Sequence, residues 1–526
     1  MSIRFRCSLV FLLIRNLTVV SVRRISGLIG ISKSSTHRCM KAIEKRNTHQ
    51  ESWLWETPEG EQWLFRMFFA AQFVFGIMSG IGVEKMSLFF TLLHLEKHVG
   101  VSPSSLRNMV KIMEEKVLEY KKIQEESHTL SSNSEVVVGG DETFFENIIL
   151  VLMDISSGYI FMEEESENRT YETWSNKVKD VISKFGINIK YMVSDRAKAL
   201  IKLASDCMNC LSIADLFHAS NEIVKLFGLR LNNKLATIKD KIIKETAALA
   251  IMMEMGKNIS IIDKQKALIN VLNQEEAVLV LSIDRYRNIL RDISMEVHPF
   301  DIKTGGIKSS SNVYDGLMEL VIQIRILQEE LQIVDNKNRA NKFSNQVDDI
   351  ASLIDAWWLW VNKELDAVDQ NQRTWLIEAL LPALYWKSQA EKTKSPEIKK
   401  EYLAAWQKAQ IALDNNCLTQ KLTAEERSRW QSWGEWMITK FQRASSAVEG
   451  RNGFLSQMHH NGRGISGRRL KVLTVIHNFV IRRPDGTTAA QRLYQTDFPD
   501  LFEWLITQMP ELPLPRQRRL AAPVSI

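Results

Sequence analysis

The sequence predicts a multidomain α+β protein in which a mixed five-stranded sheet is split by a long all-α segment. Three observations support this fold class. Short runs rich in β-branched residues, typical of strands, lie between residues 135 and 214. Helical periodicity covers residues 1–126, and it returns over 219–440 without strand signals. With 526 residues, 45% of them hydrophobic, the chain is long enough for about three or four domains.

Residues 1–50 are predicted to form a helix–turn–helix DNA-binding region. The tripeptide Gly30-Ile31-Ser32 breaks an amphipathic helix, and Ser32 can cap a second helix that starts at Lys33. Short polar and basic side chains on the first turns of such a helix suit contacts with DNA bases and phosphates. The residues expected to make them are Lys33, Ser34 and Arg38.

Residues 51–126 are predicted to form a second helical region, because the same pattern recurs within it. Gly100-Val101-Ser102 precedes Pro103, and proline suits the first position of a helix. Ser104 and Arg107 are the expected DNA contacts here. Two ordinary helical hairpins remain the alternative interpretation of the repeated pattern.

Strands are expected between residues 135 and 218 in an order that defines a compact core. A run of three valines from Val136 leads into two glycines and Asp141, which predicts a buried strand. Three antiparallel strands are followed by a helix, a strand, a helix and a short strand. This is the order of elements in an RNase H-like α/β core. The predicted strands are 135–144, 147–154, 159–163, 187–194 and 211–214, with helices over 171–185 and 196–205.

The rest of the chain is predicted to be helical. Residues 219–440 are expected to form an all-α insertion domain, in which most tryptophans serve as core or as helix–helix anchors. Residues 441–496 would complete the core with basic helices, and 497–526 would be a C-terminal tail. The uncharged run 67–83 is interpreted as a buried helix rather than a membrane span, because polar residues and glycines dilute it.

The composition favours a reducing cellular compartment, but it does not identify a binding partner. Five cysteines without a regular framework fit a reducing cytosol. The formal net charge of +6 is too small to indicate a nucleic-acid partner by itself, so the distribution of charge must decide.

Three acidic residues are candidate metal ligands. Asp141 follows two glycines on a buried strand, where a carboxylate is costly unless a cation pairs with it. Asp195 ends the fourth predicted strand. Glu449 is the sole acid from 443 to 483 in a strongly basic segment, although a glutamate at a helix start is also favoured by the helix dipole. The neighbours expected to hold the DNA backbone are Arg443, Arg451, Asn452, Arg463, Arg468, Arg469 and Lys471.

These stretches resemble the DDE-type transposases of bacterial insertion sequences, over nearly the whole chain. The resemblance rests on Gly140–Phe144, Val193–Leu200 and Ser445–Asn452, and on a tail with His459–Gly464, Arg468–Lys471 and Asp485–Ala490. It implies that Asp141, Asp195 and Glu449 form a catalytic triad. Such a triad binds two Mg²⁺ ions, which Mn²⁺ can replace, and it cuts and joins DNA ends.

Two further features bear on this resemblance. The stretch Asp215-Leu216-Phe217-His218 is similar to a C/D-x-x-H element of some split-core transposases, which makes Asp215 and His218 possible accessory residues. The Tyr-x-x-Arg string before the glutamate and the lysine after it are absent, since Gln442, Ser445 and Ser456 occupy those sites. Phosphate contacts assigned to that string therefore do not carry over.

The expected partners are double-stranded DNA, as element ends and target, and a second copy of the chain on that DNA, with no membrane. The expected location is the bacterial cytoplasm, in association with the nucleoid. Two alternatives stay open: a catalytically inactive or domesticated transposase that acts as a DNA-binding protein, and another RNase H-like nuclease. Asp154 could join the acids, but it is interpreted as a turn residue before Ser156-Ser157-Gly158.

Overall fold

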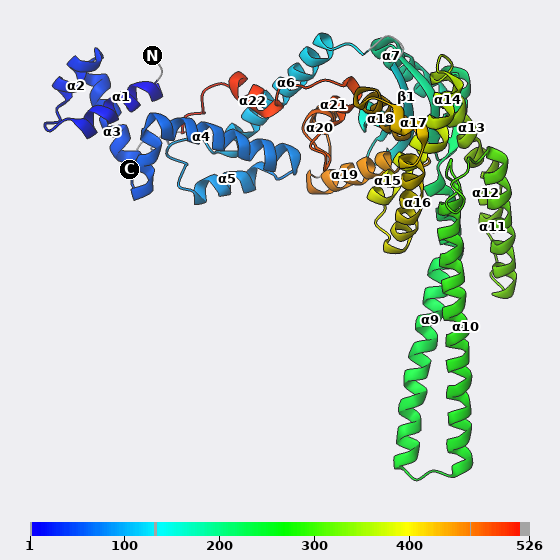
Figure 1. The fold of residues 1–526 in the computed structure, drawn as a ribbon. Coiled ribbons are helices and arrows are strands. Elements are labelled where there is room, and N and C mark those ends of the chain that lie inside the picture. Colours follow the sequence, from blue (N-terminus) through cyan, green and yellow to red (C-terminus); the bar gives the residue numbers. More distant parts are fainter. Residues whose placement is uncertain (1–2, 131–133, 463, 516–526) are drawn as a thin grey trace.

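A five-stranded mixed sheet lies at the centre of a largely helical, elongated molecule (Figure 1). The computed structural model describes residues 3–130, 134–462 and 464–515. Two small helical units lie to one side of the sheet, and a long helical hairpin projects from the body (Figure 1). The α+β fold class and the mixed five-stranded sheet predicted from the sequence are confirmed.

The first helical unit has the predicted break and cap. Its helices are α1 (Ile3–Asn16), α2 (Val22–Ile29) and α3 (Lys33–Arg46). Gly30 closes α2 with a left-handed φ of 73°, which glycine adopts without strain. The Ser32 hydroxyl then caps α3 by accepting the amide of Ser35 at 3.2 Å. Ile25, Cys39 and Ile43 are buried among these helices.

The second helical unit ends in a long helix that leads to the sheet. Its elements are η1 (Gln50–Glu56), α4 (Pro58–Ala71), η2 (Gln72–Met78), α5 (Val83–Leu92) and α6 (Pro103–Ser127). Ser102 caps α6 through the amide of Ser105, and Pro103 occupies the first position of the helix, as predicted. The uncharged run 67–83 covers the end of α4 and the π-helical η2, with Phe68, Phe73 and Ile77 buried. Across the described residues, none of the helices combines the length and apolarity that crossing a membrane requires.

The sheet has the strand order β3-β2-β1-β4-β5. Its strands are β1 (Ser134–Phe144), β2 (Ile148–Asp154), β3 (Tyr159–Ser166), β4 (Ile187–Ser194) and β5 (Leu211–Ala214). β1, β2 and β3 pair antiparallel, whereas β4 pairs parallel with both β1 and β5. The connections between the parallel strands run through α7 (Tyr171–Phe185), α8 (Lys198–Lys202) and η3 (Leu203–Cys207).

Alternate residues of β1 enter different cores, because side chains alternate across a strand. Val136 and Val138 pack in a cluster with Trp174 of α7. Val137 packs on the other side, in a cluster that includes residues of the helical insertion. Asp141 follows the register of Val137, so it faces the side away from α7.

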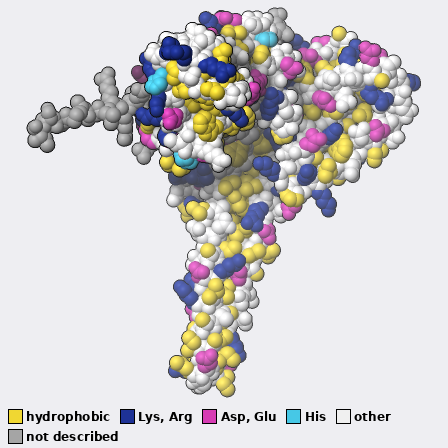
Figure 2. Space-filling view, turned by 90° about the vertical axis from the view of Figure 1, so that its left-hand side faces the viewer, with side chains coloured by type: hydrophobic (Ala, Val, Ile, Leu, Met, Phe, Trp, Pro, Cys, Tyr) yellow, Lys and Arg dark blue, Asp and Glu magenta, His cyan; other side chains and the backbone are white. Residues whose placement is uncertain are grey.

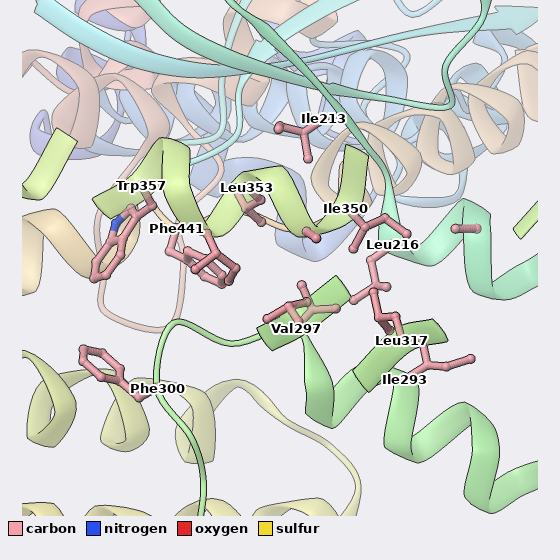
Figure 3. Packing of buried hydrophobic residues seen from close by; sticks show 14 of the residues in the cluster. Ile213, Leu216, Ile293, Val297, Phe300, Leu317, Ile350, Leu353, Trp357 and Phe441 are labelled. Atoms are coloured by element: carbon pink, nitrogen blue, oxygen red, sulfur yellow. The ribbon is translucent and has the colours of Figure 1, made fainter. Parts of the chain in front are cut away.

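Between β5 and residue 446, the described segment consists of helices joined by loops, with one isolated bridge between Phe300 and Ile307. Its elements are α9 (Leu216–Glu254), α10 (Ile259–Glu296), α11 (Ser310–Glu330), α12 (Arg339–Ser344), α13 (Val347–Glu364), α14 (Gln370–Trp375), η4 (Leu376–Leu380), α15 (Leu381–Lys392), α16 (Pro396–Asp414), α17 (Cys417–Lys421) and α18 (Ala424–Thr439). Figure 3 shows Ile350, Leu353 and Trp357 of α13 between Ile213 of the sheet and Val297 after α10. Trp357, Trp360, Trp375 and Trp386 are all buried, so these tryptophans are core residues.

The C-terminal part returns to the sheet. Its helices are α19 (Ser446–Gly462), α20 (Gly467–Phe479), α21 (Ala489–Tyr494) and α22 (Leu501–Gln508). α19 packs against β1 and β2, and α20 packs against β3. The predicted tail from 497 needs correction: α22 packs against α6 and buries Leu501 and Leu505, while 516–526 lie outside the described residues.

Candidate active site

The two glycines before Asp141 let a helix approach the strand closely. A Cβ atom on Gly139 would lie 2.9 Å from Cγ2 of Val448 and 3.0 Å from Cδ1 of Ile155. Val448 belongs to the first turn of α19, which also carries Glu449. Glycine at position 139 therefore allows α19 to dock on β1 with Glu449 near Asp141.

The structure brings the three predicted acids together. Gly139 of β1 pairs with Val193 of β4, two residues before Asp141 and Asp195 respectively. Burial raises the pKa of Asp141 to about 7, and the negative charge of Glu449, a hydrogen bond with it and the charge of Asp195 add to this rise. The cluster is thus electrostatically strained as a set of free carboxylates, which is the situation that a bound cation relieves.

Asn452 is bonded to the acid cluster rather than directed at solvent. Its Nδ2 donates to Oδ2 of Asp141 at 2.7 Å. It follows Glu449 by three residues on α19, so both side chains lie on one side of the helix. Its Oδ1 is buried and has no hydrogen-bond partner among the described residues. The sequence predicts that Asn452 holds the DNA backbone, whereas in the structure it orients the carboxylate of Asp141.

Asp215 joins the two ends of the helical insertion. One of its oxygens caps α9 by accepting the amides of Phe217 at 2.7 Å and His218 at 3.2 Å. The other accepts the amide of Ser445 at 2.7 Å and the Ser445 hydroxyl. Asp215 is only 1% exposed, so this carboxylate is a buried clamp between the starts of α9 and α19.

His218 completes the link to the acids. Its Nε2 lies 2.8 Å from Oε1 of Glu449, in a half-buried pair. The backbone amide of Leu216 also donates to the carbonyl of Arg443 at 3.0 Å. The accessory residues expected from the sequence, Asp215 and His218, therefore both adjoin the acid cluster, one through the backbone and one through a side chain.

Two other acids near the cluster are engaged elsewhere. Glu142 points to the opposite face of the sheet, where Nε1 of Trp174 donates to it at 3.4 Å and burial raises its pKa. Asp154 is fully buried and accepts from the Ser156 hydroxyl at 2.8 Å and the Ser157 amide at 2.9 Å. The interpretation of Asp154 as a turn residue is confirmed.

Arg451 is the clearest correction to the predicted DNA contacts. Its guanidinium forms a two-pronged ion pair with Glu163, at 2.7 Å from Nε to Oε1 and 2.6 Å from Nη2 to Oε2. Both side chains are almost completely buried, at 3% and 0% exposure. A group that contacts phosphates must reach solvent, so Arg451 has instead the position of a structural residue that ties α19 to β3.

Two more predicted contacts are committed largely to protein partners. The guanidinium of Arg443 donates to the carbonyl of Val297, at 3.1 Å, and to that of Ser294, at the end of α10. Arg469 pairs with Glu114 at 2.7 Å, and burial lowers the pKa of its guanidinium. Both side chains are half-buried, so they attach helices to the body.

The remaining predicted DNA contacts lie at the surface. Those with exposed positions are Lys33, Ser34, Arg38, Ser104, Arg107, Arg468 and Lys471. Arg107 pairs with Glu84 at 2.6 Å and Arg468 with Glu115 at 2.8 Å, in exposed ion pairs that water can replace. Arg463 lies outside the described residues.

A separate group of possible metal ligands lies in the second helical unit. Among the described residues, ligand atoms of three such side chains all lie within 4.8 Å of one another at His49, Glu51 and His94, and not at the three acids. The two imidazole rings stack at 3.7 Å with planes 5° apart. Ring nitrogens bind metals in the ring plane, so stacked rings point their lone pairs in parallel and do not converge on one ion.

Comparison with known proteins adds one match. The profile of DUF6399, a family of unknown function, matches residues 376–521. That segment contains Glu449 and Asn452 but neither Asp141 nor Asp195. None of the curated proteins matches the sequence.

Proposed function

We propose that the protein is a metal-dependent DNA transposase of the DDE type, with Asp141, Asp195 and Glu449 as its catalytic acids. One observation carries the proposal: acids from β1, the end of β4 and α19 lie near one another, and burial together with the charges of Glu449 and Asp195 raises the pKa of Asp141 to about 7. The strand order β3-β2-β1-β4-β5, with β3, β2 and β1 antiparallel, also supports it, because this is the topology of an RNase H-like core.

The residues at the cluster fit Mg²⁺. Hard cations of this kind prefer oxygen ligands, and the cluster offers three carboxylates together with the unpartnered amide oxygen of Asn452. A pair of Mg²⁺ ions held there would activate the attacking hydroxyl or water and stabilise the leaving oxygen. Mn²⁺ is expected to substitute, because it accepts the same oxygen ligands.

The chain's own residues prepare this set of ligands. Asn452 fixes the carboxylate of Asp141, and His218 fixes that of Glu449. Asp215 holds the backbone from which Glu449 projects, through its bonds to Ser445. These contacts restrict the rotation of the acids, so less freedom is lost when a cation and the DNA backbone bind.

The DNA partner belongs to the same proposal. The exposed basic side chains at the start of α3, with Arg107 on α6 and Lys471 on α20, are candidate contacts to the element ends and the target. Joining two ends calls for two copies on one DNA complex, located in the bacterial cytoplasm with the nucleoid.

Cleavage of DNA that carries the sequences flanking the gene tests the proposal. Purified protein with Mg²⁺ or Mn²⁺ should cut at the element ends, and Asp141→Asn, Asp195→Asn and Glu449→Gln should each abolish cutting while DNA binding is retained. Glu146→Gln is the matched control, because this exposed acid lies five positions from Asp141 outside the cluster.

Three results would overturn parts of this proposal. Binding without cleavage by the unmodified protein would favour a DNA-binding role. Cleavage that survives Glu449→Gln would remove Glu449 from the metal ligands. Metal-dependent cutting that ignores the flanking sequences would favour another nuclease of the same fold.

A further inference from the structure

The long hairpin of α9 and α10 projects from the body as an arm (Figure 1). Its two helices hold each other through few polar contacts in its outer part. Lys239 pairs with Glu276 at 3.7 Å, and Nε2 of Gln265 donates to the carbonyl of Glu245 at 3.0 Å. The arm therefore has to be stabilised mainly by apolar packing.

The outer part of the arm lacks a core of its own. All of residues 239–271 are described, and none of them is buried. Large apolar side chains are exposed instead, among them Ile243, Ile251, Met253, Met255, Ile259, Ile261, Leu268 and Val271. The outer parts of the two helices therefore gain little from packing on each other, and such an exposed apolar surface marks an interaction site.

Along α9 this surface follows a seven-residue repeat. Leu229, Ala236, Ile243 and Ala250 recur at this spacing, and all four are exposed, with Leu229 at 72% and Ile243 at 67%. At about 20° of drift per heptad they lie within one narrow stripe, on the side of the helix away from buried Ile238. Figure 2 looks toward α9 and shows hydrophobic side chains along this side of the arm.

The stripe is complementary to itself. The stripe supplies one apolar position in each heptad, and its large side chains can fill the spaces between residues of a facing helix, as they do in a coiled coil. The stripe alternates large and small residues, in the order Leu, Ala, Ile, Ala. In an antiparallel pair, Leu229 of each copy faces Ala250 of the other, and Ile243 faces Ala236.

Charge supports the same register. The two-fold axis of this pairing passes between positions 239 and 240. It brings Lys225, one turn before Leu229, to the level of Glu254 of the other copy, one turn after Ala250. Glu254 has no ion pair within 4 Å among the described residues, and Lys225 pairs with Glu222 at 3.3 Å on an exposed surface, so both can form this contact. The exposed tip residue Met255 then reaches the level of Val224 on the second copy, whose side chain is 39% exposed.

We propose that the arm is a dimerisation element, in which α9 of a second copy packs antiparallel on the stripe of Leu229, Ala236, Ile243 and Ala250. The arrangement is isologous, because the same residues serve both copies and the contact closes on itself. It goes beyond the proposed reaction and does not depend on it, since the dimer forms without DNA or metal.

Light scattering on the purified full chain, without DNA, measures the outcome. We expect twice the chain mass of 60.6 kDa for the unmodified protein. Ile243→Glu should halve the mass with unchanged helical circular dichroism. Leu281→Glu is the matched control, because Leu281 is 70% exposed on α10, outside the stripe, and this variant should remain dimeric.

Cysteine cross-linking on a Cys417→Ser background tests the register, since Cys417 is an exposed thiol of the chain. Asp240→Cys, next to the axis, should form a disulfide-linked dimer. Leu229→Cys alone should not, whereas Leu229→Cys with Ala250→Cys should.

The proposal would be overturned by a monomeric unmodified protein at all accessible concentrations, by an Ile243→Glu variant that stays dimeric, or by cross-linking of Leu229→Cys alone, which would mean parallel arms. Loss of DNA binding in Ile243→Glu without a change of mass would identify DNA as the occupant of the stripe, against a second copy.

Discussion

His218 and Glu449 lie 231 positions apart in the sequence, yet Nε2 of the first and Oε1 of the second are 2.8 Å apart. This contact joins the first turn of α9 to the first turn of α19, on either side of the helical insertion. We predict that His218→Ala lowers metal-dependent DNA cleavage by about 10- to 100-fold, as loss of a ligand's supporting partner typically does. Cleavage rates and DNA affinity, measured side by side, check this.

His218→Gln separates positioning from packing. Glutamine can still donate to Glu449, so this variant should recover part of the lost activity and require less additional Mg²⁺ than His218→Ala. Equal activities of the two variants would contradict a positioning role through this hydrogen bond.

The raised pKa of Asp141 predicts that the stability of the metal-free protein, measured in the presence of a chelator, depends on pH. A carboxyl whose pKa is about 7 in the folded chain and 3.8 in the unfolded chain keeps its proton to higher pH when folded. The folded state therefore binds more protons between these values, and stability falls as pH rises from about 4 to 7. Asp141→Asn, which carries no charge, should lose less of its melting temperature between pH 5 and pH 8.

Thermal unfolding in EDTA at several pH values makes this comparison, with Glu146→Gln as the control expected to follow the unmodified protein. Addition of Mg²⁺ should raise the melting temperature of the unmodified protein more at pH 8 than at pH 6, because the cation competes with the proton. A metal response that is the same at both pH values would contradict the assignment of Asp141 as a ligand.

The ion pair of Arg451 and Glu163 is predicted to be a major contribution to stability. Arg451→Met leaves Glu163 buried and uncompensated, which typically costs about 3–5 kcal/mol of unfolding free energy. Arg468→Ala removes an exposed pair with Glu115 and should cost at most about 1 kcal/mol. Denaturant unfolding of the two variants gives both values.

The double variant Arg451→Met with Glu163→Gln should recover much of the loss, because no unpaired charge remains in the core. A stability loss near zero for Arg451→Met, accompanied by weaker and less salt-dependent DNA binding, would restore the original prediction that this arginine contacts DNA.

Gly139 is predicted to control the approach of α19 to the sheet. Gly139→Ala introduces a Cβ atom 2.9 Å from Cγ2 of Val448, which typically costs about 1–3 kcal/mol and shifts the helix that carries Glu449. Cleavage should fall more than DNA binding. Gly450→Ala, one residue after Glu449, meets nothing within 4 Å and should be tolerated, which makes it the matched control.

Local sequence predicted most elements of this protein correctly. Val136–Val138 and the other apolar runs gave strands close to their observed bounds, since burial of β-branched residues is a local signal. Ser32 caps its helix as expected, and Ser102 caps α6 in the same way, because a cap depends on four consecutive residues. Asn452 lies three residues after Glu449, and this helical spacing could have placed it near the acids. The many basic residues of that segment favoured a DNA contact instead.

By itself, the sequence determined the strand-forming core, the helical segment after it and the capped turn before α3, all features encoded within a few neighbouring residues. Tertiary structure alone decided that Arg451 is buried with Glu163, that Asp215 clamps Ser445, and that residues after 500 form a packed helix. Each of these needs a partner more than 200 positions away in the sequence, and the charge of a residue does not show whether folding provides one. The reason is physical: burial and pairing are properties of the assembled core, and they decide whether an arginine binds a phosphate or a carboxylate.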